Sequence, residues 1–134
     1  MTTKKRPSHR LTPLELEIMN VLWEGGPATV QAVQERLLPE RKLAYNTVQT
    51  MLNVLHRKRK VRRTLKSRAY EYAPSVTRRQ AAHHALGDLI RRMFDGSAES
   101  LVMSMVENRH LTPGELARLT ALLEERKGGD RGDR

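Results

Sequence analysis

Cysteine is absent from all 134 residues of the sequence. Its absence excludes disulfide bonds, thiolate metal sites and cysteine nucleophiles. Long apolar runs are also missing, because none approaches the roughly 18 residues that a membrane-spanning helix needs. The basic N-terminus is followed by LTPLELEIM rather than by an uninterrupted apolar segment, so we expect no signal peptide. These absences favour a cytoplasmic protein in a reducing compartment.

Aromatic residues are few, with one Trp, three Tyr and one Phe. A core made instead of Leu, Val, Met and Ile favours helices over a β-sandwich. The length suits a single domain, or one small domain with an appendage.

Motifs for catalysis or metal binding are also lacking. The five histidines, His9, His56, His83, His84 and His110, show no HExxH spacing, and the adjacent pair would point apart on a helix. No Gly-rich phosphate loop, Ser-His-Asp order or paired-carboxylate pattern stands out. We therefore predict no metal, no cofactor and no enzymatic activity.

Positive charge is concentrated in one short stretch of the chain. The formal net charge is +10, and residues 41–72 carry ten Lys or Arg side chains against the single acid Glu71. A dense basic patch attracts polyphosphate through Coulomb steering and counterion release, which favours a nucleic-acid partner. A solvated basic face, or a patch for acidic lipid, would give the same composition.

Helix-start and helix-stop signals precede this basic stretch. Thr12 and Glu15, with a proline directly after the threonine, form a capping box that opens a first helix. The sequence Gly25-Gly26-Pro27 comes next, and we expect the helix to end there. Thr29 is expected to cap a second helix over residues 30–37.

A third helix, expected from Ala44 or Tyr45 to about Arg59, carries the side chains best suited to reading bases. Its apolar positions recur at the spacing of a core stripe and comprise Val48, Met51, Leu52 and Leu55. Its opposite face has no acid and offers side chains that donate to and accept from base edges. We predict base contacts from Asn46, Gln49, Thr50 and Asn53. An ordinary solvent-exposed polar face is the alternative.

Two alternating segments after this helix predict a β-hairpin over residues 61–65 and 69–73. The connection has no Asn-Gly pair, so we expect a loop of three or more residues. Its basic tip suits a wing that lies beside the phosphate backbone. The predicted phosphate contacts, from the hairpin and from the ends of the third helix, are Arg41, Lys42, Tyr45, Arg57, Lys58, Arg63, Lys66 and Arg68.

The order of helix, basic segment and two-stranded ribbon indicates a DNA-reading module, which we place over residues 11–74. The expected fold class is mainly α with a small β wing. A helical arm follows over residues 75–127, and we expect residues 1–10 and 128–134 to be disordered.

The three helices of this arm carry apolar stripes that are too small to form a self-sufficient core. A second copy would bury these stripes and would supply two reading helices for a palindromic site on double-stranded DNA. The side chains predicted to hold a homodimer together are Leu86, Leu89, Ile90, Met93, Leu101, Val102, Met105, Leu119 and Leu122. Packing of the arm against the N-terminal domain of the same chain is the alternative.

Four segments resemble the BlaI/MecI penicillinase-repressor family. They are LTPLELEIMNVLW at residues 11–23, YNTVQTMLNVL at 45–55, RAYEYA at 68–73 and AESLVMSMVENRHLT at 98–112. The resemblance follows the family's order and includes the C-terminal arm.

The resemblance implies a winged-helix domain, a dimerisation arm and repression through operator palindromes, which in the best-known members control β-lactam resistance genes. It also implies induction by proteolysis, in which a membrane-bound zinc metallopeptidase sensor triggers cleavage within the dimerisation helices. The β-lactam-responsive members are cut at an Asn-Phe pair before Val-Glu, and the matching pair here is Ser104-Met105. The polar residue that often caps the reading helix is Ala44 in this chain.

Two other function classes fit the same charge pattern. A protein-interaction adaptor, whose basic ribbon meets an acidic partner, would show no preference for any DNA duplex. A DNA-binding activator or nucleoid-type protein would differ from a repressor in the output of a reporter gene.

Overall fold

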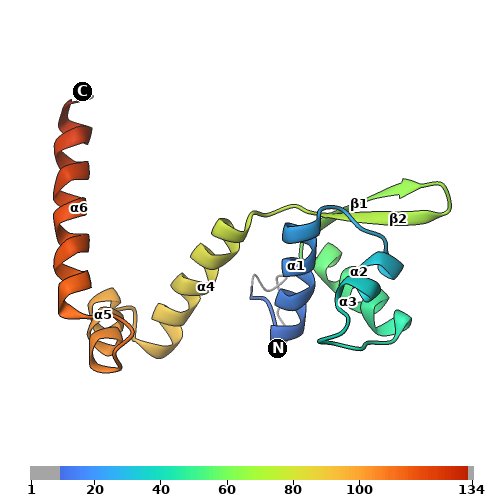
Figure 1. Cartoon of the computed structure of the whole chain (residues 1–134), viewed down its shortest axis with the longest axis horizontal. Helices are drawn as coiled ribbons and strands as arrows, with labels where there is room; N and C mark the ends of the chain where they lie inside the picture. Colours follow the sequence, from blue (N-terminus) through green and yellow to red (C-terminus); the bar gives the residue numbers. More distant parts are fainter. Residues whose placement is uncertain (1–9, 133–134) are drawn as a thin grey trace, which may run out of the picture. The chain divides into compact units, whose positions relative to one another are not determined.

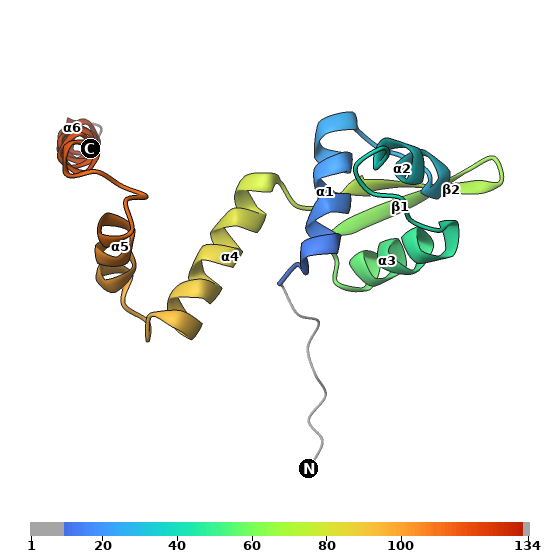
Figure 2. The same ribbon diagram turned by 60° about the horizontal axis from the view of Figure 1, so that its bottom comes forward.

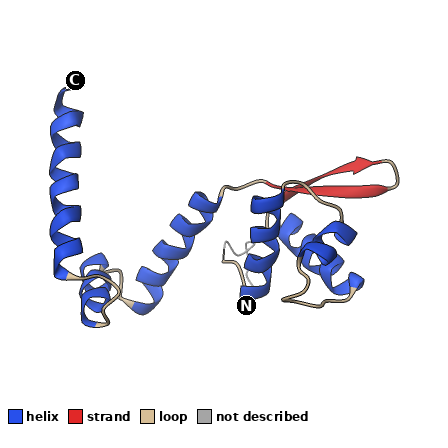
Figure 3. Ribbon diagram, viewed as in Figure 1, coloured by secondary structure: helices blue, strands red, loops and turns tan. Residues whose placement is uncertain are grey.

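The structure, a computed structural model, describes residues 10–132, and the chain divides into two compact units at the Asp88–Leu89 bond. The described chain is mostly helical with one two-stranded antiparallel sheet, as Figure 3 shows. The predicted fold class is therefore confirmed. The domain boundary expected after residue 74 stays a prediction, and the predicted N-terminal arm lies outside the described residues except for Arg10.

The N-terminal unit contains a group of helices beside a β-hairpin. In chain order its elements are α1 (Pro13–Gly25), α2 (Val30–Arg36), α3 (Tyr45–Arg57), β1 (Val61–Lys66), β2 (Ala69–Pro74) and the first part of α4 (Arg78–Met93). Figures 1 and 2 both show α1, α2 and α3 grouped beside the base of the hairpin, whose turn projects away from them. This is the arrangement of a winged helix-turn-helix domain.

Helix α1 begins and ends at the predicted residues. The Thr12 backbone N–H donates to Glu15 Oε1 at 2.8 Å, and the Glu15 N–H donates to the Thr12 hydroxyl at 3.2 Å. These reciprocal bonds satisfy two N–H groups that the first helical turn would otherwise leave without a partner. At the other end Gly26 takes a φ of 83°, a left-handed conformation that favours glycine, and its N–H donates to the Leu22 carbonyl.

The core of the N-terminal unit forms where the helices meet the base of the hairpin. Each helix turns an apolar face inward, as its sequence periodicity predicts. The buried apolar side chains are Ile18, Met19, Leu22, Ala28, Val30, Val33, Leu37, Val48, Leu52, Leu55, Val61 and Tyr72. Because three of them come from one stripe of α3, the rotation of α3 about its own axis is fixed and its opposite face points to solvent.

The hairpin is tied to the helices by a short bridge. The Ala28 N–H donates to the Tyr72 carbonyl at 2.9 Å, and the Tyr72 N–H donates to the Ala28 carbonyl at 2.8 Å. The segment between α1 and α2 therefore pairs with β2 on the edge that β1 leaves open.

The turn of the hairpin is shorter than predicted. Lys66 pairs with Ala69, so only Ser67 and Arg68 connect the strands, and the expected loop of three or more residues is wrong. Ser67 takes a φ of 57°, which is the conformation that two-residue hairpin turns require. The prediction failed because it treated an Asn-Gly pair as necessary, whereas serine also reaches this conformation at a cost.

Helix α3 ends slightly before the predicted position. Arg59 takes a left-handed φ of 64°, and the Lys60 N–H donates back to the Leu55 carbonyl at 2.8 Å. This is a Schellman-type ending formed without glycine. It turns the chain directly from α3 into β1.

The start of α4 is attached to α1 within the N-terminal unit. The Trp23 indole N–H donates to the Val76 carbonyl at 2.9 Å, and the Arg78 guanidinium lies 5.3 Å from the centre of the Trp23 ring. The same guanidinium donates to Asn20 at 3.3 Å and to Glu24 at 3.5 Å. These contacts place the junction between β2 and α4 against α1.

The C-terminal unit contains the end of α4 together with α5 (Ala98–Glu107) and α6 (Pro113–Gly132). Asp95 and Gly96 end α4 in left-handed conformations, and Ser97 then caps α5 by accepting the N–H of Ser100 at 3.0 Å. None of the described side chains of α4 and α5 is fully buried, and those described in α6, up to residue 128, are exposed.

Helix α6 is longer than predicted. It runs to Gly132, although the sequence pattern placed the start of a disordered tail at Gly128. Glycine lowers helix stability by about 1 kcal/mol relative to alanine but ends a helix only where it adopts a left-handed conformation. The expected tail is therefore wrong for residues 128–132, and residues 133–134 lie outside the described part.

Candidate nucleic-acid interface

The four side chains predicted to read bases share one exposed face of α3. Asn46, Gln49, Thr50 and Asn53 are all exposed, whereas the stripe on the opposite side of the helix is buried. Such side chains can donate to and accept from the edges of bases in a major groove, which is wide enough for an α-helix. Their role in DNA binding remains a prediction.

The N-terminus of α3 has no side-chain cap. Ala44 occupies the N-cap position and accepts no hydrogen bond through its side chain, and the first turn contains no acid. Backbone N–H groups at an uncapped helix start carry partial positive charge and bind phosphate oxygens readily. Tyr45 and Lys42, two predicted phosphate contacts, are exposed on either side of this position.

The register of the hairpin divides its side chains between two faces. Arg63 stands opposite Tyr72 and Leu65 stands opposite Tyr70, and directly paired residues share a face of an antiparallel sheet. The Tyr72 hydroxyl reaches Asn53 of α3 at 3.5 Å, so this face is the one that adjoins α3. Arg63 therefore lies on the same side of the domain as α3.

Arg63 is held in place by an aromatic neighbour. Its guanidinium lies 4.4 Å from the centre of the Tyr70 ring, a distance at which a cation is attracted to the π face. Both side chains are exposed. The contact orients the charge without neutralising it, because the ring has no carboxylate.

The opposite face of the hairpin carries positive charge that is already partnered. The Lys66 ammonium lies 3.3 Å from the Glu71 carboxylate, and Arg62 donates to the Pro74 carbonyl at 2.8 Å. Lys66 is nevertheless 65% exposed, so the pair is weak in water. Arg68 is exposed in the turn, and Arg57 is exposed at the end of α3.

Arg41 is exposed but forms an ion pair with α1. Its guanidinium donates to both carboxylate oxygens of Glu17, at 3.1 and 2.6 Å. These hydrogen bonds hold the pKa of the Glu17 carboxyl below its ordinary value. Arg41 can reach phosphate only by sharing or leaving this partner.

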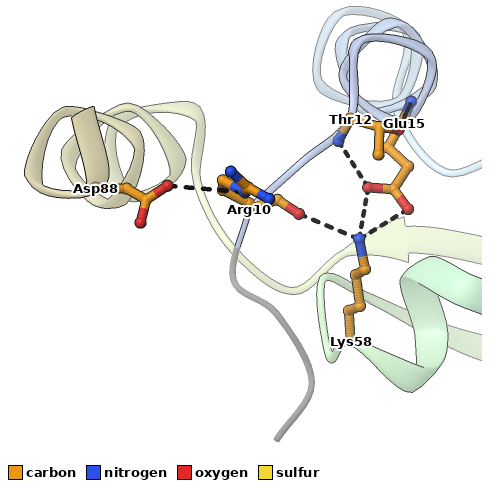
Figure 4. A network of polar contacts seen from close by, with 5 residues as sticks. All are labelled: Arg10, Thr12, Glu15, Lys58 and Asp88. Carbon is orange, nitrogen blue, oxygen red and sulfur yellow. Dashed lines mark hydrogen bonds and ion pairs between the residues drawn. The ribbon is translucent and has the colours of Figure 1, made fainter. Parts of the chain in front are cut away.

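Lys58 lies elsewhere than predicted. Its ammonium sits between the Glu15 carboxylate, at 2.8 and 2.9 Å, and the Arg10 carbonyl at 3.1 Å, as Figure 4 shows. Its side chain is 16% exposed and that of Glu15 only 3% exposed. Three acceptor oxygens thus surround an ammonium that has three N–H donors. Lys58 holds α3 to α1 and is not available to phosphate in this arrangement.

Lys60 is a second basic residue that the structure turns inward. It is 2% exposed, and loss of hydration is the main cause that lowers the pKa of its ammonium, assisted by the neighbouring charge of Lys58. The charge of Glu15 opposes this shift. Within the basic run after His56, Arg57 and Arg59 are exposed, whereas Lys58 and Lys60 point inward. The net charge of the segment does not predict this difference.

The side chains predicted to form a dimer are solvent-accessible in this single chain. Leu86, Leu89, Met93, Leu119 and Leu122 are exposed. Ile90, Leu101, Val102 and Met105 are half-buried. The Ser104-Met105 pair lies inside α5, where the Asn108 backbone and side-chain N–H groups donate to the Ser104 carbonyl at 3.0 and 2.8 Å.

Among the side chains that the structure describes, up to residue 128, no cluster of three or more His, Asp or Glu is arranged to hold a metal ion. None of the described helices is both long and apolar enough to cross a membrane.

Comparison with known proteins decides the family. Residues 11–125 match the sequence model of the penicillinase repressor family. The chain belongs to the penicillinase repressor family. The resemblance identified from the sequence is therefore confirmed, and membership in a family of transcriptional repressors confirms the expectation that the chain is not an enzyme.

Relatives of this penicillinase repressor family member carry regulatory names. The penicillinase repressor of Bacillus licheniformis is 27% identical over 124 residues, covering 92% of this chain and 95% of the relative. The transcriptional regulator BlaI of Mycobacterium tuberculosis is 36% identical over 100 residues, covering 73% of this chain and 72% of the relative. The methicillin resistance regulatory protein MecI of Staphylococcus aureus is 21% identical over 119 residues, covering 89% and 97%.

A solved structure of a transcriptional regulator from Thermotoga maritima aligns with a TM-score of 0.45 and 19% identity, covering 92% of this chain and 78% of that chain. The winged-helix assignment rests instead on the helices and hairpin described above.

Proposed function

We propose that this chain is a sequence-specific DNA-binding transcriptional repressor that acts as a homodimer on palindromic operators. The observation that carries the proposal is the exposed, acid-free polar face of α3 with Arg63 of the hairpin on the same side. The names of its relatives, which are repressors and transcriptional regulators, support the same role.

We propose that α3 contacts the bases, and that the hairpin and the residues around the ends of α3 contact the phosphates. The amides and hydroxyl of Asn46, Gln49, Thr50 and Asn53 would contact base edges in the major groove. Arg63 would anchor the wing on the backbone, and the uncapped helix start near Ala44 would receive a phosphate oxygen. Lys42, Tyr45, Arg57, Lys66 and Arg68 would add further backbone contacts, as would Arg41 when it leaves Glu17.

The homodimer is proposed from the apolar side chains of the arm. Leu119, Leu122 and Leu123 lie within one or two turns of α6 and are all exposed, and Met93 of α4 is the most exposed large apolar side chain described. Apolar side chains at helical spacing are stabilised when a partner removes them from water, at about 25 cal/mol per Å². Two joined copies would also present two α3 helices, which matches a two-fold symmetric DNA site.

Induction by proteolysis is proposed for the same arm. Cleavage of the Ser104-Met105 bond would separate α6 from the rest of the chain and so remove part of the dimer contact. A membrane-bound zinc metallopeptidase sensor is the partner implied by the resemblance. The gene for such a sensor beside the gene for this chain would support this step.

The decisive experiment is selection of bound duplexes from a random DNA pool by the full chain at physiological salt. Recovery of a palindrome with a fixed half-site spacing is expected, because both specificity and two-fold symmetry would be imposed on the DNA. A pool that stays random would instead favour a basic adaptor of acidic proteins. A reporter gene under the recovered operator should be expressed more strongly after the gene for this chain is deleted, whereas an activator would give the opposite change.

A further inference from the structure

Tyr72 is a rigidly held side chain at the base of the hairpin. It is 2% exposed, and its backbone is paired with Ala28 on one side and with Arg63 of β1 on the other. A residue bonded along both edges and packed in the core has little freedom to turn. Its phenol ring therefore places the hydroxyl at a fixed point.

The hydroxyl of a buried tyrosine needs a hydrogen-bond partner. Here it lies 3.5 Å from Oδ1 of Asn53, on the neighbouring helix α3. The distance is long for an O–H···O bond, so the contact is weak, and it favours one orientation of the amide without locking it. Asn53 is otherwise exposed on the face that we propose reads bases.

We propose that Tyr72 is a positioning residue that turns the Asn53 amide so that its NH₂ group, and not its carbonyl, faces the DNA. The inference rests on the proposed function, because it assigns a hydrogen-bonding sense to one of the side chains that read bases. An asparagine with both groups free binds adenine through two hydrogen bonds, because adenine offers a donor at N6 and an acceptor at N7. With Oδ1 turned toward Tyr72, Asn53 offers donors alone.

A donor in the major groove favours a different set of bases. Guanine offers two acceptors, O6 and N7, whereas adenine N7 and thymine O4 are single acceptors and cytosine offers only a donor at N4. Asn53 in this chain therefore favours guanine at the position that it contacts, and it loses the second hydrogen bond that would single out adenine. Neither the sequence of α3 nor the identity of residue 53 predicts this preference, because it depends on a residue in β2.

The test uses random-pool selection with the full-length wild-type chain and three single variants. Asn53→Ala identifies the contacted position as the one whose preference disappears. Guanine at that position in the wild type, favoured about five-fold or more, is the expected result, since a second bond worth about 1 kcal/mol gives this ratio. A preference for any other base there would overturn the inference, even if the tyrosine variant failed to fold.

Tyr72→Phe removes the hydroxyl and keeps the ring, so the core remains filled. The freed amide should then shift the preference at the same position toward adenine, while affinity for random DNA changes less than two-fold. Tyr70→Phe is the matched control, because Tyr70 lies on the same strand and the same face but its ring contacts Arg63. It should leave the preference unchanged.

Each outcome separates the inference from the function on which it rests. A palindrome recovered equally by the wild type and Asn53→Ala would leave the repressor proposal standing and overturn the role of Tyr72. An unchanged base preference in folded Tyr72→Phe would do the same. A wild-type pool with no preference at all would overturn the proposed function, and the inference with it.

Discussion

The Lys58 ammonium lies 2.8 Å from the Glu15 carboxylate and thereby joins the C-cap of α3 to the first turn of α1. Glu15 also accepts the N–H of Thr12, so a single carboxylate caps one helix and holds the end of another. The orientation of the proposed reading helix thus depends on a contact outside the surface that we propose faces DNA.

Replacing Lys58 by methionine should destabilise the domain. The Glu15 carboxylate would remain in a site that is 3% exposed without its cation, and loss of one partner of a buried pair costs about 3 to 5 kcal/mol. Urea unfolding followed by circular dichroism measures this change. Lys66→Ala is the control, because its pair with Glu71 is exposed and should contribute no more than about 1 kcal/mol. Equal losses in both variants would contradict the assigned role.

Lys60 should make folding stability depend on pH in the alkaline range. Burial lowers the pKa of its ammonium below the ordinary value of 10.5, so in the window just below 10.5 the unfolded chain binds more protons than the folded chain. Stability should therefore rise as pH increases through this window. Lys60→Met should lack this rise and be the more stable protein at neutral pH, which unfolding curves at pH 7 and pH 9.5 would measure. If stability rose more steeply with pH in Lys60→Met than in the wild type, the assigned effect of Lys60 would be wrong.

Arg63 and Gln49 should affect DNA binding in different ways. Arg63→Ala removes a proposed phosphate contact, so affinity for all duplexes should fall and the slope of log K against log salt should decrease by about 1. Gln49→Ala should instead relax the preference at one base position, by about 1 to 3 kcal/mol. Binding titrations at several salt concentrations against operator and scrambled duplexes measure both effects.

Lys66→Ala provides a comparison within the hairpin. Lys66 lies on the other face and is partnered by Glu71, so its effect on the salt slope should be smaller than that of Arg63→Ala. A larger effect of Lys66 would show that the face of the hairpin opposite α3 is the one that approaches DNA.

A charge in the arm should separate the proposed dimer. Leu122→Arg places a cation among exposed leucines of α6, where a dimer contact would have to bury it. The variant should sediment as a monomer at concentrations where the wild type is a dimer, and its N-terminal core, to which Leu122 does not belong, should still fold. Arg126→Leu, a change of similar size in the same helix, should leave the wild-type mass unchanged.

The Ser104-Met105 bond should become easier to cleave when α5 is weakened. The Asn108 side chain donates to the Ser104 carbonyl at 2.8 Å and to its hydroxyl at 3.3 Å, and a protease must unwind this turn to bind it. Asn108→Ala should therefore raise the cleavage rate about two- to five-fold, as expected for loss of a hydrogen bond worth about 0.5 to 1 kcal/mol.

Mass spectrometry of limited proteolysis products would locate and time this cut. Thr120→Ala removes a comparable side-chain bond, from Thr120 to the Leu116 carbonyl in α6, and serves as the control. An equal effect of both substitutions would mean that helix stability in the arm, rather than Asn108, governs access.

The sequence predicts the helices of the winged domain well because their signals are local. The Thr12 capping box, the stop at Gly26 and the stripe that includes Val48 each depend on residues within a few positions of one another. The exposure of the polar face of α3, which we propose reads bases, follows from that stripe, since burying one side of a helix exposes the other.

The features that the sequence did not predict depend on contacts between distant segments. Lys58 and Lys60 look like their exposed neighbours, and only the position of α1 shows that they turn inward. The contact between Tyr72 and Asn53 joins β2 to α3 across 19 positions of sequence. The short turn at Ser67 was missed because its backbone conformation is imposed by the strand register rather than by its own preference.

Trp23 is the single tryptophan of the sequence, and its indole is bonded to Val76 and covered by Arg78 where β2 passes into α4. The tryptophan fluorescence of the protein therefore comes from this one side chain. A change in emission wavelength or quenching on adding operator DNA, or on cutting the arm, would report on this joint without any attached label. The protein thus carries its own optical sensor within the N-terminal unit, at the point where the hairpin passes into α4.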